Sequence, residues 1–477
     1  MEDIKLKAGL EIHQQLNTNK LFCNCPSILR SDEPKMKVER KLNPVVGETG
    51  EIDIAAAYEK LKDKTYIYEV YDTTCLVELD EEPPHQINKD AIKIALQIAT
   101  LMNCKIFPVT QIMRKTVIDG SNTSGFQRTA LIAHDGFIET SEGKVRIDTI
   151  AIEEDAARIV SHDENTSTFR LDRLGIPLVE ITTAPDLKSP EQIKEAALKI
   201  GEILRACNVK RGIGTIRQDV NISIKGSKRV EIKGFQDPKA MIKTIENEIR
   251  RQQKCLEEKA CKNEVRKAHP DATTSFLRPM PGAARMYPET DHPLIKISKQ
   301  MLDDVKSNIP KLASEHKSFL KEFGLNEQLV KDIVQQSKIE EFKTLSKEYD
   351  NYNLIAKILT IYMKEIAIKT KTPLNELNEK LNTDILTEIL QNLKQEKLNE
   401  SDVKQIMNEI SKGKKLKQLL EKETINPEEL QNEVKQTIKS KPGLSQGAYM
   451  GLIIAKLKGK ASGKEIAKEL SKQLKSK

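Results

Sequence analysis

The sequence lacks a long apolar run. No stretch reaches the about 18 consecutive apolar residues that a membrane-spanning helix requires, and the first residues, MEDIKLKAGLEIH, lack the apolar core of a signal peptide. The seven cysteines are odd in number and scattered, which fits a reducing cytoplasm better than a disulfide framework. These absences predict a cytoplasmic protein with no membrane partner.

The common phosphate-binding and nucleophile motifs are absent too. No GxxxxGK[ST] loop occurs, and the nearest match, Gly459–Glu465, is one residue short and ends in Glu. Gly212–Gly214 lacks the third glycine of a GxGxxG loop, and no GxSxG elbow exists. If the protein uses ATP, metal ions and side chains on a sheet must therefore hold the phosphates.

Strand patterns dominate the first part of the sequence. The whole chain has 477 residues, which is too many for one hydrophobic core, so we expect more than one domain. The predicted strands are TYIYEVYDTTCLVEL, KVRIDTIAIEED, IPLVEITT, IRQDVNISI and RVEIKGF. Three helices are predicted at 89–101, 190–206 and 237–258, and Ser189 is a plausible N-cap for the second. We therefore expect residues 1–293 to form a strand-rich domain.

Helical periodicity takes over after residue 293. The clearest helix is predicted at 352–370, and the sequence LNTD at 381–384 predicts a new helix start. We therefore expect an α+β protein with a helical domain at 294–380 and a second helical module at 381–477. Residues 435–477 hold eleven Lys and two Glu, a net charge of +9. These lysines either form a solvated face or contact nucleic-acid phosphates.

Carboxylates gather on one face of several predicted strands. In GLEIHQQL, Glu11, His13 and Gln15 share one face, and apolar side chains occupy the other. Further strand residues with this pattern are Glu153, Glu154, Glu180, Arg217, Asp219, Asn221, Ser223, Glu231 and Lys233. Acidic faces repel one another unless cations lie between them, and Mg²⁺ prefers oxygen ligands. The pattern predicts either a solvated surface or a site for Mg²⁺ and a nucleotide.

Cys23 and Cys25 form a partial metal motif. A structural zinc needs four ligands, and no second closely spaced cysteine pair exists. Cys75 is the nearest candidate for a third ligand. Zinc and a pair of small buried thiols both remain open, whereas the other cysteines carry no signal.

Six motifs, in order along the chain, resemble the B/E family of tRNA-dependent amidotransferase subunits. They are GLEIHQQL…KLFC, MRKTVIDGSNTSGFQRT, IEEDAAR, LDRLGIPLVEITT, GTIRQDVNISI and RPMPGAARMYPETD. The second and the last resemble the archaeal E-type member of this family more than the bacterial B-type member. The resemblance is dense up to residue 293 and weaker beyond it.

The resemblance implies a fold. The first 293 residues would form a glutamine-synthetase-like antiparallel-sheet cradle that carries out catalysis. An all-α helical domain would follow at 294–380, and a YqeY-like helical tail at 381–477 would bind tRNA. One departure is that E-type members carry a large inserted domain before LRPMPGAARMYPETD, whereas only residues 257–272 are available for it here. The second cysteine pair of many B-type members is missing as well.

The resemblance also implies a reaction and its residues. Glutamate mischarged on tRNA(Gln) would be phosphorylated by ATP with Mg²⁺, and ammonia would displace the phosphate, as in a glutaminyl-tRNA synthase of the glutamine-hydrolysing type. The implied catalytic residues are Glu11, His13, Lys115, Glu154, Glu180, Arg217 and Asp219. Of these, His13, Glu154 and Glu180 would bind the metal, with Glu11 beside them. Lys115, Arg217 and Asp219 match positions that handle phosphate charge or ammonia.

The ammonia must come from a partner, because nothing in the sequence resembles an amidase or asparaginase nucleophile. The partner of an E-type member would be the asparaginase-like D-type protein, and that of a B-type member would be the amidase of the A type with a small C-type protein. A non-catalytic tRNA-binding scaffold is the alternative from another class of function. The presence of His13, Glu154 and Glu180 disfavours a scaffold.

Overall fold

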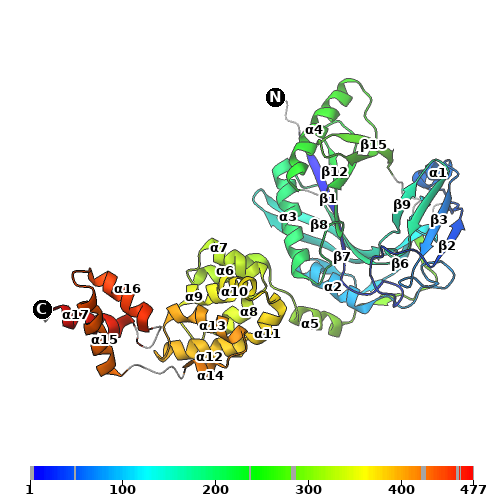
Figure 1. Ribbon diagram of the computed structural model, residues 1–477. Coiled ribbons are helices and arrows are strands. Elements are labelled where there is room, and N and C mark those ends of the chain that lie inside the picture. The colour runs from blue at the N-terminus through cyan, green and yellow to red at the C-terminus, as the bar shows by residue number, and fades with distance from the viewer. Residues whose placement is uncertain are drawn as a thin grey trace. The chain divides into compact units, whose positions relative to one another are not determined.

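The chain folds into two compact units, which span Met1–Leu312 and Ala313–Lys477 in a computed structural model (Figure 1). The residues that the structure describes are 5–47, 50–235, 238–280, 286–420, 426–457, 461 and 463–475. Strands lie in the first unit, and the described part of the second is helical. The predicted α+β class, with a sheet-rich first part and a helical C-terminal part, is confirmed.

One large sheet organises the first unit. Its strands follow the order β15-β14-β13-β12-β1-β11-β8-β7-β6-β16, and β4 pairs with β7. The bounds are β1 Lys7–Gln15, β4 Lys105–Ile106, β6 Ile112–Thr116, β7 Phe126–Thr140, β8 Gly143–Glu154, β11 Pro177–Thr183, β12 Ile216–Ser223, β13 Val230–Phe235, β14 Glu264–Ala268, β15 Thr274–Pro279 and β16 Met286–Pro288. The sheet is antiparallel except where β13 pairs with β14.

Two small sheets have the strand orders β2-β3-β10-β9 and β17-β5. The bounds are β2 Met36–Arg40, β3 Thr65–Val70, β5 Val109–Thr110, β9 Arg158–His162, β10 Thr166–Arg170 and β17 Ile295–Lys296. The prediction of one strand through TYIYEVYDTTCLVEL is wrong in its second half. β3 ends at Val70, and the following residues form turns, such as the one closed by the hydrogen bond from Asp80 N to the Val77 carbonyl.

The apolar face of the large sheet forms the core with the helices beside it. Leu10 and Ile12 of β1 are fully buried in this core, as alternation predicts. Helices α2 (Lys89–Leu101), α3 (Pro190–Ala206) and α4 (Pro238–Glu257) lie along the outside of the curved sheet (Figure 1). The predicted bounds of α2 and α3 are confirmed, and the Ser189 hydroxyl caps α3 by accepting the Gln192 N–H at 3.0 Å.

The first unit extends beyond the boundary predicted at residue 293. Helix α5 (Lys299–Ser307) packs on α2 and contributes Val305 to the core of the sheet. Helix α1 (Ile54–Lys60) is the remaining helix of this unit among the described residues.

The second unit contains helices around two hydrophobic cores. The bounds are α6 Ala313–Glu322, α7 Glu327–Gln335, α8 Ile339–Leu345, α9 Tyr352–Lys357, α10 Met363–Thr370, α11 Leu374–Lys380, α12 Thr383–Lys394, α13 Val403–Ser411, α14 Leu416–Leu420, α15 Pro427–Ser440, α16 Gln446–Leu457 and α17 Gly463–Lys475. Buried side chains between residues 320 and 416 form one core, and buried side chains between residues 430 and 470 form the other. The boundary predicted at residue 380 falls inside the first core, because Leu377 and Leu386 both belong to it. The packing favours α15–α17 as a separate module.

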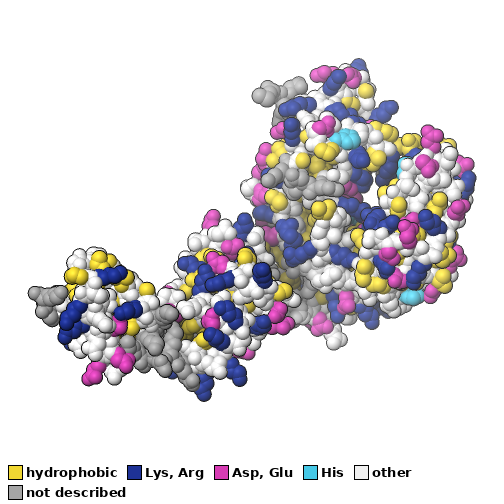
Figure 2. Space-filling view, in the orientation of Figure 1, with side chains coloured by type: hydrophobic (Ala, Val, Ile, Leu, Met, Phe, Trp, Pro, Cys, Tyr) yellow, Lys and Arg dark blue, Asp and Glu magenta, His cyan; other side chains and the backbone are white. Residues whose placement is uncertain are grey.

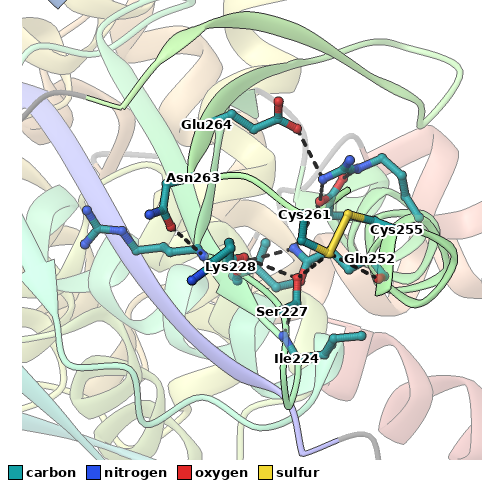
Figure 3. Close-up of a disulfide and its surroundings, with 12 residues drawn as sticks. Ile224, Ser227, Lys228, Gln252, Cys255, Cys261, Asn263 and Glu264 are labelled. Atoms are coloured by element: carbon teal, nitrogen blue, oxygen red, sulfur yellow. Dashed lines mark hydrogen bonds and ion pairs between the residues drawn. A yellow bond between two sulfur atoms is a disulfide. The ribbon is translucent and has the colours of Figure 1, made fainter. Parts of the chain in front are cut away.

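Cys255, near the end of α4, forms a disulfide with Cys261 (Figure 3). This pair was not predicted, because the turn from α4 towards β14 that brings the two residues together has no signature in the sequence. None of the helices among the described residues combines the length and the apolar character needed to cross a membrane.

Candidate active site on the polar face of the sheet

A row of charged side chains crosses the face of the large sheet opposite α2, α3 and α4. Its members are Lys115 on β6, Glu153 on β8, Glu180 on β11, Glu11 and His13 on β1, Arg217 and Asp219 on β12, and Glu231 and Lys233 on β13. Strand alternation produces the row, because most members have at least one buried apolar core residue next to them in their strand. Figure 2 shows Lys and Arg side chains around the hollow of the first unit.

Strand β1 lies between β11 and β12, so the predicted catalytic residues of these three strands lie close together. His13 lies opposite Glu180 of β11 on one side and Arg217 of β12 on the other. Glu11 lies opposite Asp219. Side chains of directly opposed residues on one face are about 5 Å apart at Cβ. Five of the seven predicted catalytic residues therefore share one place on the sheet.

His13 is buried among carboxylates. Its Nε2 lies 3.4 Å from both Glu153 Oε1 and Glu180 Oε2, and 3.7 Å from Glu11 Oε1. Burial lowers the pKa of His13, but the hydrogen bonds and charges of Glu153 and Glu180 outweigh burial and raise this pKa to about 10. Since imidazole binds metals in its neutral form, a cation bound here would replace the proton.

Lys115 lies at one end of this group. Its Nζ is 2.7 Å from Glu153 Oε2 and 3.0 Å from Glu180 Oε2. Burial acts to raise the pKa of Glu180, but the charges of Lys115 and His13 outweigh burial and hold this pKa well below its usual value. At Glu153, burial also acts to raise the pKa, and the charges of Lys115 and His13 again outweigh it and lower the pKa. Both carboxylates are therefore ionised beside an ammonium that can contact phosphate.

Lys233 occupies the other end of the row. Its Nζ lies 2.9 Å from Asp219 Oδ2 and 2.6 Å from Glu231 Oε1. Burial, followed by the charge of Glu180, raises the pKa of Glu11, which lies between the two ends of the row. A cation near Glu11 would stabilise its charged form.

Two groups of side chains within the row are close enough to hold a metal. Glu11, His13 and Glu180 form one group, and Glu11, Asp219 and Glu231 form the other; the ligand atoms of each lie within 4.8 Å of one another. Lys233 already contacts two of the three carboxylates in the second group. The first group combines two carboxylates with an imidazole and fits a divalent cation such as Mg²⁺.

Glu154 does not join this group, which corrects its predicted place among the metal ligands. It points to the opposite side of β8, where its Oε2 lies 3.5 Å from Arg128 Nη1 and accepts the Arg128 N–H at 3.2 Å. Glu153 takes the place beside His13. The sequence could have indicated this placement. Ile150 and Ile152 are buried in the core, and the period of two puts Glu154 on their face of β8 and Glu153 on the opposite face.

Arg217 and Asp219 lie in the row but have partners of their own. The Arg217 guanidinium is 3.3 Å from Asp155 Oδ1, and its side chain is 44% exposed. Asp219 accepts hydrogen bonds from Lys233 and from the Gly234 N–H. Asp155, which was not predicted, is buried and also accepts a hydrogen bond from Gln15 at 2.6 Å.

A cavity of about 410 Å³ opens beside the row. Lys115 and Glu180 line it together with mainly apolar residues, among them Met113, Leu131 and Met286. The cavity places an apolar wall next to the ionised groups. A substrate with an uncharged part and a charged part would fit such a site.

Comparisons with known proteins agree on one family. A family model described as GatB/GatE catalytic domain matches residues 6–303. The E subunit of glutamyl-tRNA(Gln) amidotransferase from Methanocaldococcus jannaschii is 40% identical over an alignment 507 positions long, which spans 76% of this chain and 80% of that protein. Its counterpart from Methanococcus maripaludis is 37% identical over 568, covering 88% of each chain. Both alignments are longer than the 477 residues of this chain, so these relatives carry residues that the chain lacks.

Proposed function

Because the chain belongs to the GatB/GatE family, we propose that its polar row activates the side-chain carboxylate of glutamate mischarged on tRNA(Gln). The chain is thus part of a tRNA-dependent amidotransferase, of the E type that its relatives represent. The observation that carries the proposal is the group Glu11, His13 and Glu180 beside Lys115, on the sheet that the family model matches.

The row supplies what phosphoryl transfer to a carboxylate needs. Glu11, His13 and Glu180 would hold Mg²⁺, which supplies positive charge to the phosphate oxygens of ATP. Lys115 and Arg217 would contact the phosphates, and Glu153 keeps Lys115 and His13 in place. The glutamate carboxylate attacks the γ-phosphorus and ADP leaves; ammonia then attacks the acyl phosphate and phosphate leaves. We propose that Asp219 lies near the entering ammonia.

We propose that ammonia comes from an asparaginase-like partner of the D type, and that the whole complex works in the cytoplasm. The large sheet would correspond to the glutamine-synthetase-like cradle of the family. The purified chain is therefore expected to form glutaminyl-tRNA(Gln) from glutamyl-tRNA(Gln), ATP and Mg²⁺ with ammonium chloride as donor. It should form none with glutamine or asparagine. Separation of the two aminoacyl-tRNAs after nuclease digestion measures the product.

The matched control for this experiment is the same chain with Glu180→Gln and ammonium as donor. Amidation by the purified wild-type chain with asparagine alone would overturn the need for a partner. Failure with ammonium in the presence of ATP and Mg²⁺ would contradict the proposed activity itself.

The α15–α17 module is proposed to anchor tRNA in the manner of a YqeY-like tail. Its lysines are exposed around a small apolar core, as for Lys435, Lys439 and Lys468, and phosphate contacts position a nucleic acid without reading its sequence. Removing residues 421–477 leaves the core at 320–416 complete. This truncation is expected to weaken tRNA binding and to flatten its salt dependence by about 0.7 to 0.9 in log–log slope per lost phosphate contact.

Binding titrations at three ionic strengths, for the full-length and the truncated chain, measure that slope. A full-length chain with Lys435, Lys439 and Lys468 changed to Gln tests the charge without removing the module. If the slope is the same in all three proteins, the lysines only keep the protein soluble. The maximum rate at saturating tRNA should fall much less than the affinity, because the polar row lies in the other unit.

A further inference from the structure

Two arginines face each other across neighbouring strands, on the side of the sheet opposite to the cavity. Arg114 of β6 lies directly opposite Arg128 of β7. Both side chains are largely buried, with 19% and 6% exposed. Like charges on directly opposed residues repel each other. The pair therefore needs a carboxylate between its two guanidinium groups.

Glu289, which follows β16, supplies that carboxylate. Its Oε2 accepts hydrogen bonds from Arg114 Nε at 2.9 Å and from Arg128 Nε at 2.8 Å, and its side chain is fully buried. Burial acts to raise the pKa of Glu289, but the hydrogen bonds from Arg114, the Asp291 N–H and Arg128 outweigh burial and lower this pKa to about 2. Glu289 is therefore ionised, and its charge ties β6 to β7.

The same residue fastens β16 to the end of the sheet. β16 pairs with β6 over three residues, which place Met286 opposite Lys115. The Glu289 N–H donates to the Ile112 carbonyl at 2.9 Å, and the Glu289 carbonyl accepts a hydrogen bond from the Gln111 side chain at 2.9 Å. Because so short a strand has few ladder hydrogen bonds of its own, these contacts help to keep β16 in place.

The three strands that meet at Glu289 also form one wall of the cavity. Lys115 follows Arg114 on β6, so its side chain points to the cavity side. Thr129 follows Arg128 on β7 in the same way. Lys115, Thr129 and Met286 all line the cavity beside the polar row. The wall and the buried charges thus lie on opposite faces of the same strands.

We propose that Glu289 is a positioning residue, which holds β6, β7 and β16 so that Lys115 and the cavity wall keep the geometry that phosphoryl transfer requires. Glu153 and Glu180 fix the Lys115 ammonium, whereas Glu289 fixes the backbone that carries it. A misplacement of about 1 Å in a group that contacts substrate can lower a rate about 100-fold. The inference rests on the proposed function, in which Lys115 contacts the phosphates of ATP.

The test compares Glu289→Gln with the matched control Glu248→Gln. Glu248 is an equally buried carboxylate beyond the other end of the polar row, where it lies 2.8 Å from Arg251 of α4 and 3.8 Å from Arg266 of β14. Both variants lose the charge of a buried carboxylate that pairs with arginine, so both should unfold at a lower denaturant concentration.

Only Glu289→Gln should lower kcat, by about 100-fold at saturating ATP, Mg²⁺, glutamyl-tRNA(Gln) and ammonium. The chain should still fold, because Asp291 remains 3.1 Å from Arg114 and Glu154 remains 3.5 Å from Arg128. Equal kcat in folded Glu289→Gln and Glu248→Gln would overturn the inference. An inactive wild-type chain would instead contradict the proposed function, so the two failures are distinguishable.

Arg114→Gln keeps the test valid if Glu289→Gln fails to fold, because Glu289 then remains paired with Arg128. This variant cuts the tie from Glu289 to the side chain next to Lys115, and it should lower kcat by about 10-fold. Arg251→Gln is its control, since it removes an arginine from a buried carboxylate outside the polar row. The same kcat in these two variants would also overturn the inference.

Hydrogen exchange tests the positioning without any measurement of activity. In Glu289→Gln, the backbone amides of β6 should exchange at least about 10-fold faster than in the wild type, because the loss of a buried contact makes local opening easier. In Glu248→Gln they should exchange at the wild-type rate. Unchanged exchange of β6 in Glu289→Gln would show that Glu289 does not hold this strand.

Discussion

Glu180→Gln is expected to lower the rate of ATP-dependent glutamine formation on tRNA by at least about 100-fold with ammonium as donor. Glu180 contacts both Lys115 and His13, at 3.0 Å and 3.4 Å, and it belongs to the group of three side chains that fits a cation. The amide keeps the volume of the side chain but removes the charge that binds a cation and orients the Lys115 ammonium. Because the other carboxylates remain, the fold should be retained.

Initial rates over a range of Mg²⁺ concentrations measure this effect, and thermal unfolding monitors the fold. The control is Glu139→Gln on β7, whose side chain is 60% exposed. The rate of this control should match the wild type. A Glu180→Gln chain that turns over normally at sub-millimolar Mg²⁺ would show that Glu180 is not a metal ligand.

Glu153→Gln is expected to raise the Mg²⁺ concentration needed for activity by about 10- to 100-fold, as loss of a residue that orients a metal-binding His does. Glu153 contacts His13 at 3.4 Å and Lys115 at 2.7 Å, so its charge holds both in place. Glu154→Gln should leave the Mg²⁺ dependence unchanged and lower the free energy of unfolding by about 1–3 kcal/mol, because it weakens a buried contact with Arg128. Glu289 still pairs with Arg128 in that variant, at 2.8 Å.

The two variants form a matched pair at adjacent positions. Mg²⁺ titrations of activity and chemical denaturation should separate them, with the catalytic defect in one and the stability defect in the other. If Glu154→Gln shifts the Mg²⁺ dependence and Glu153→Gln does not, Glu154 is a metal ligand, as the family resemblance implied, and the assignment of Glu153 is wrong.

Strands β1, β8, β11, β12 and β13 of the large sheet could be predicted because alternation is a local property, whereas β6 and β7 were not predicted. Glu11 and His13 on β1 and Asp219 on β12 follow the period of two, and the structure places them on one face. The same rule assigns Glu153 to this face, whereas the resemblance pointed to Glu154. Register between strands cannot be read from one sequence, so the opposition of His13 and Glu180 needed the structure.

Contacts between irregular segments could not be predicted. Glu78 carried no signal, because nothing in its local sequence shows that the turns after β3 return to Cys23. The disulfide between Cys255 and Cys261 likewise depends on the turn that follows α4. In the second unit, helical periodicity marked individual helices such as α12, but it does not show which helices share a core.

The most direct measurement is phosphate release from ATP by the purified chain with Mg²⁺ and no ammonia donor. Glutamyl-tRNA(Gln) should stimulate release strongly, because ATP phosphorylates the glutamate carboxylate and, with no ammonia present, water then hydrolyses the acyl phosphate to glutamate and phosphate. Uncharged tRNA(Gln) and glutaminyl-tRNA(Gln) should not stimulate it, since neither presents a free side-chain carboxylate, and Glu180→Gln should abolish the stimulation. Equal release with charged and uncharged tRNA, or undiminished release in Glu180→Gln, would contradict activation of glutamate on the polar row.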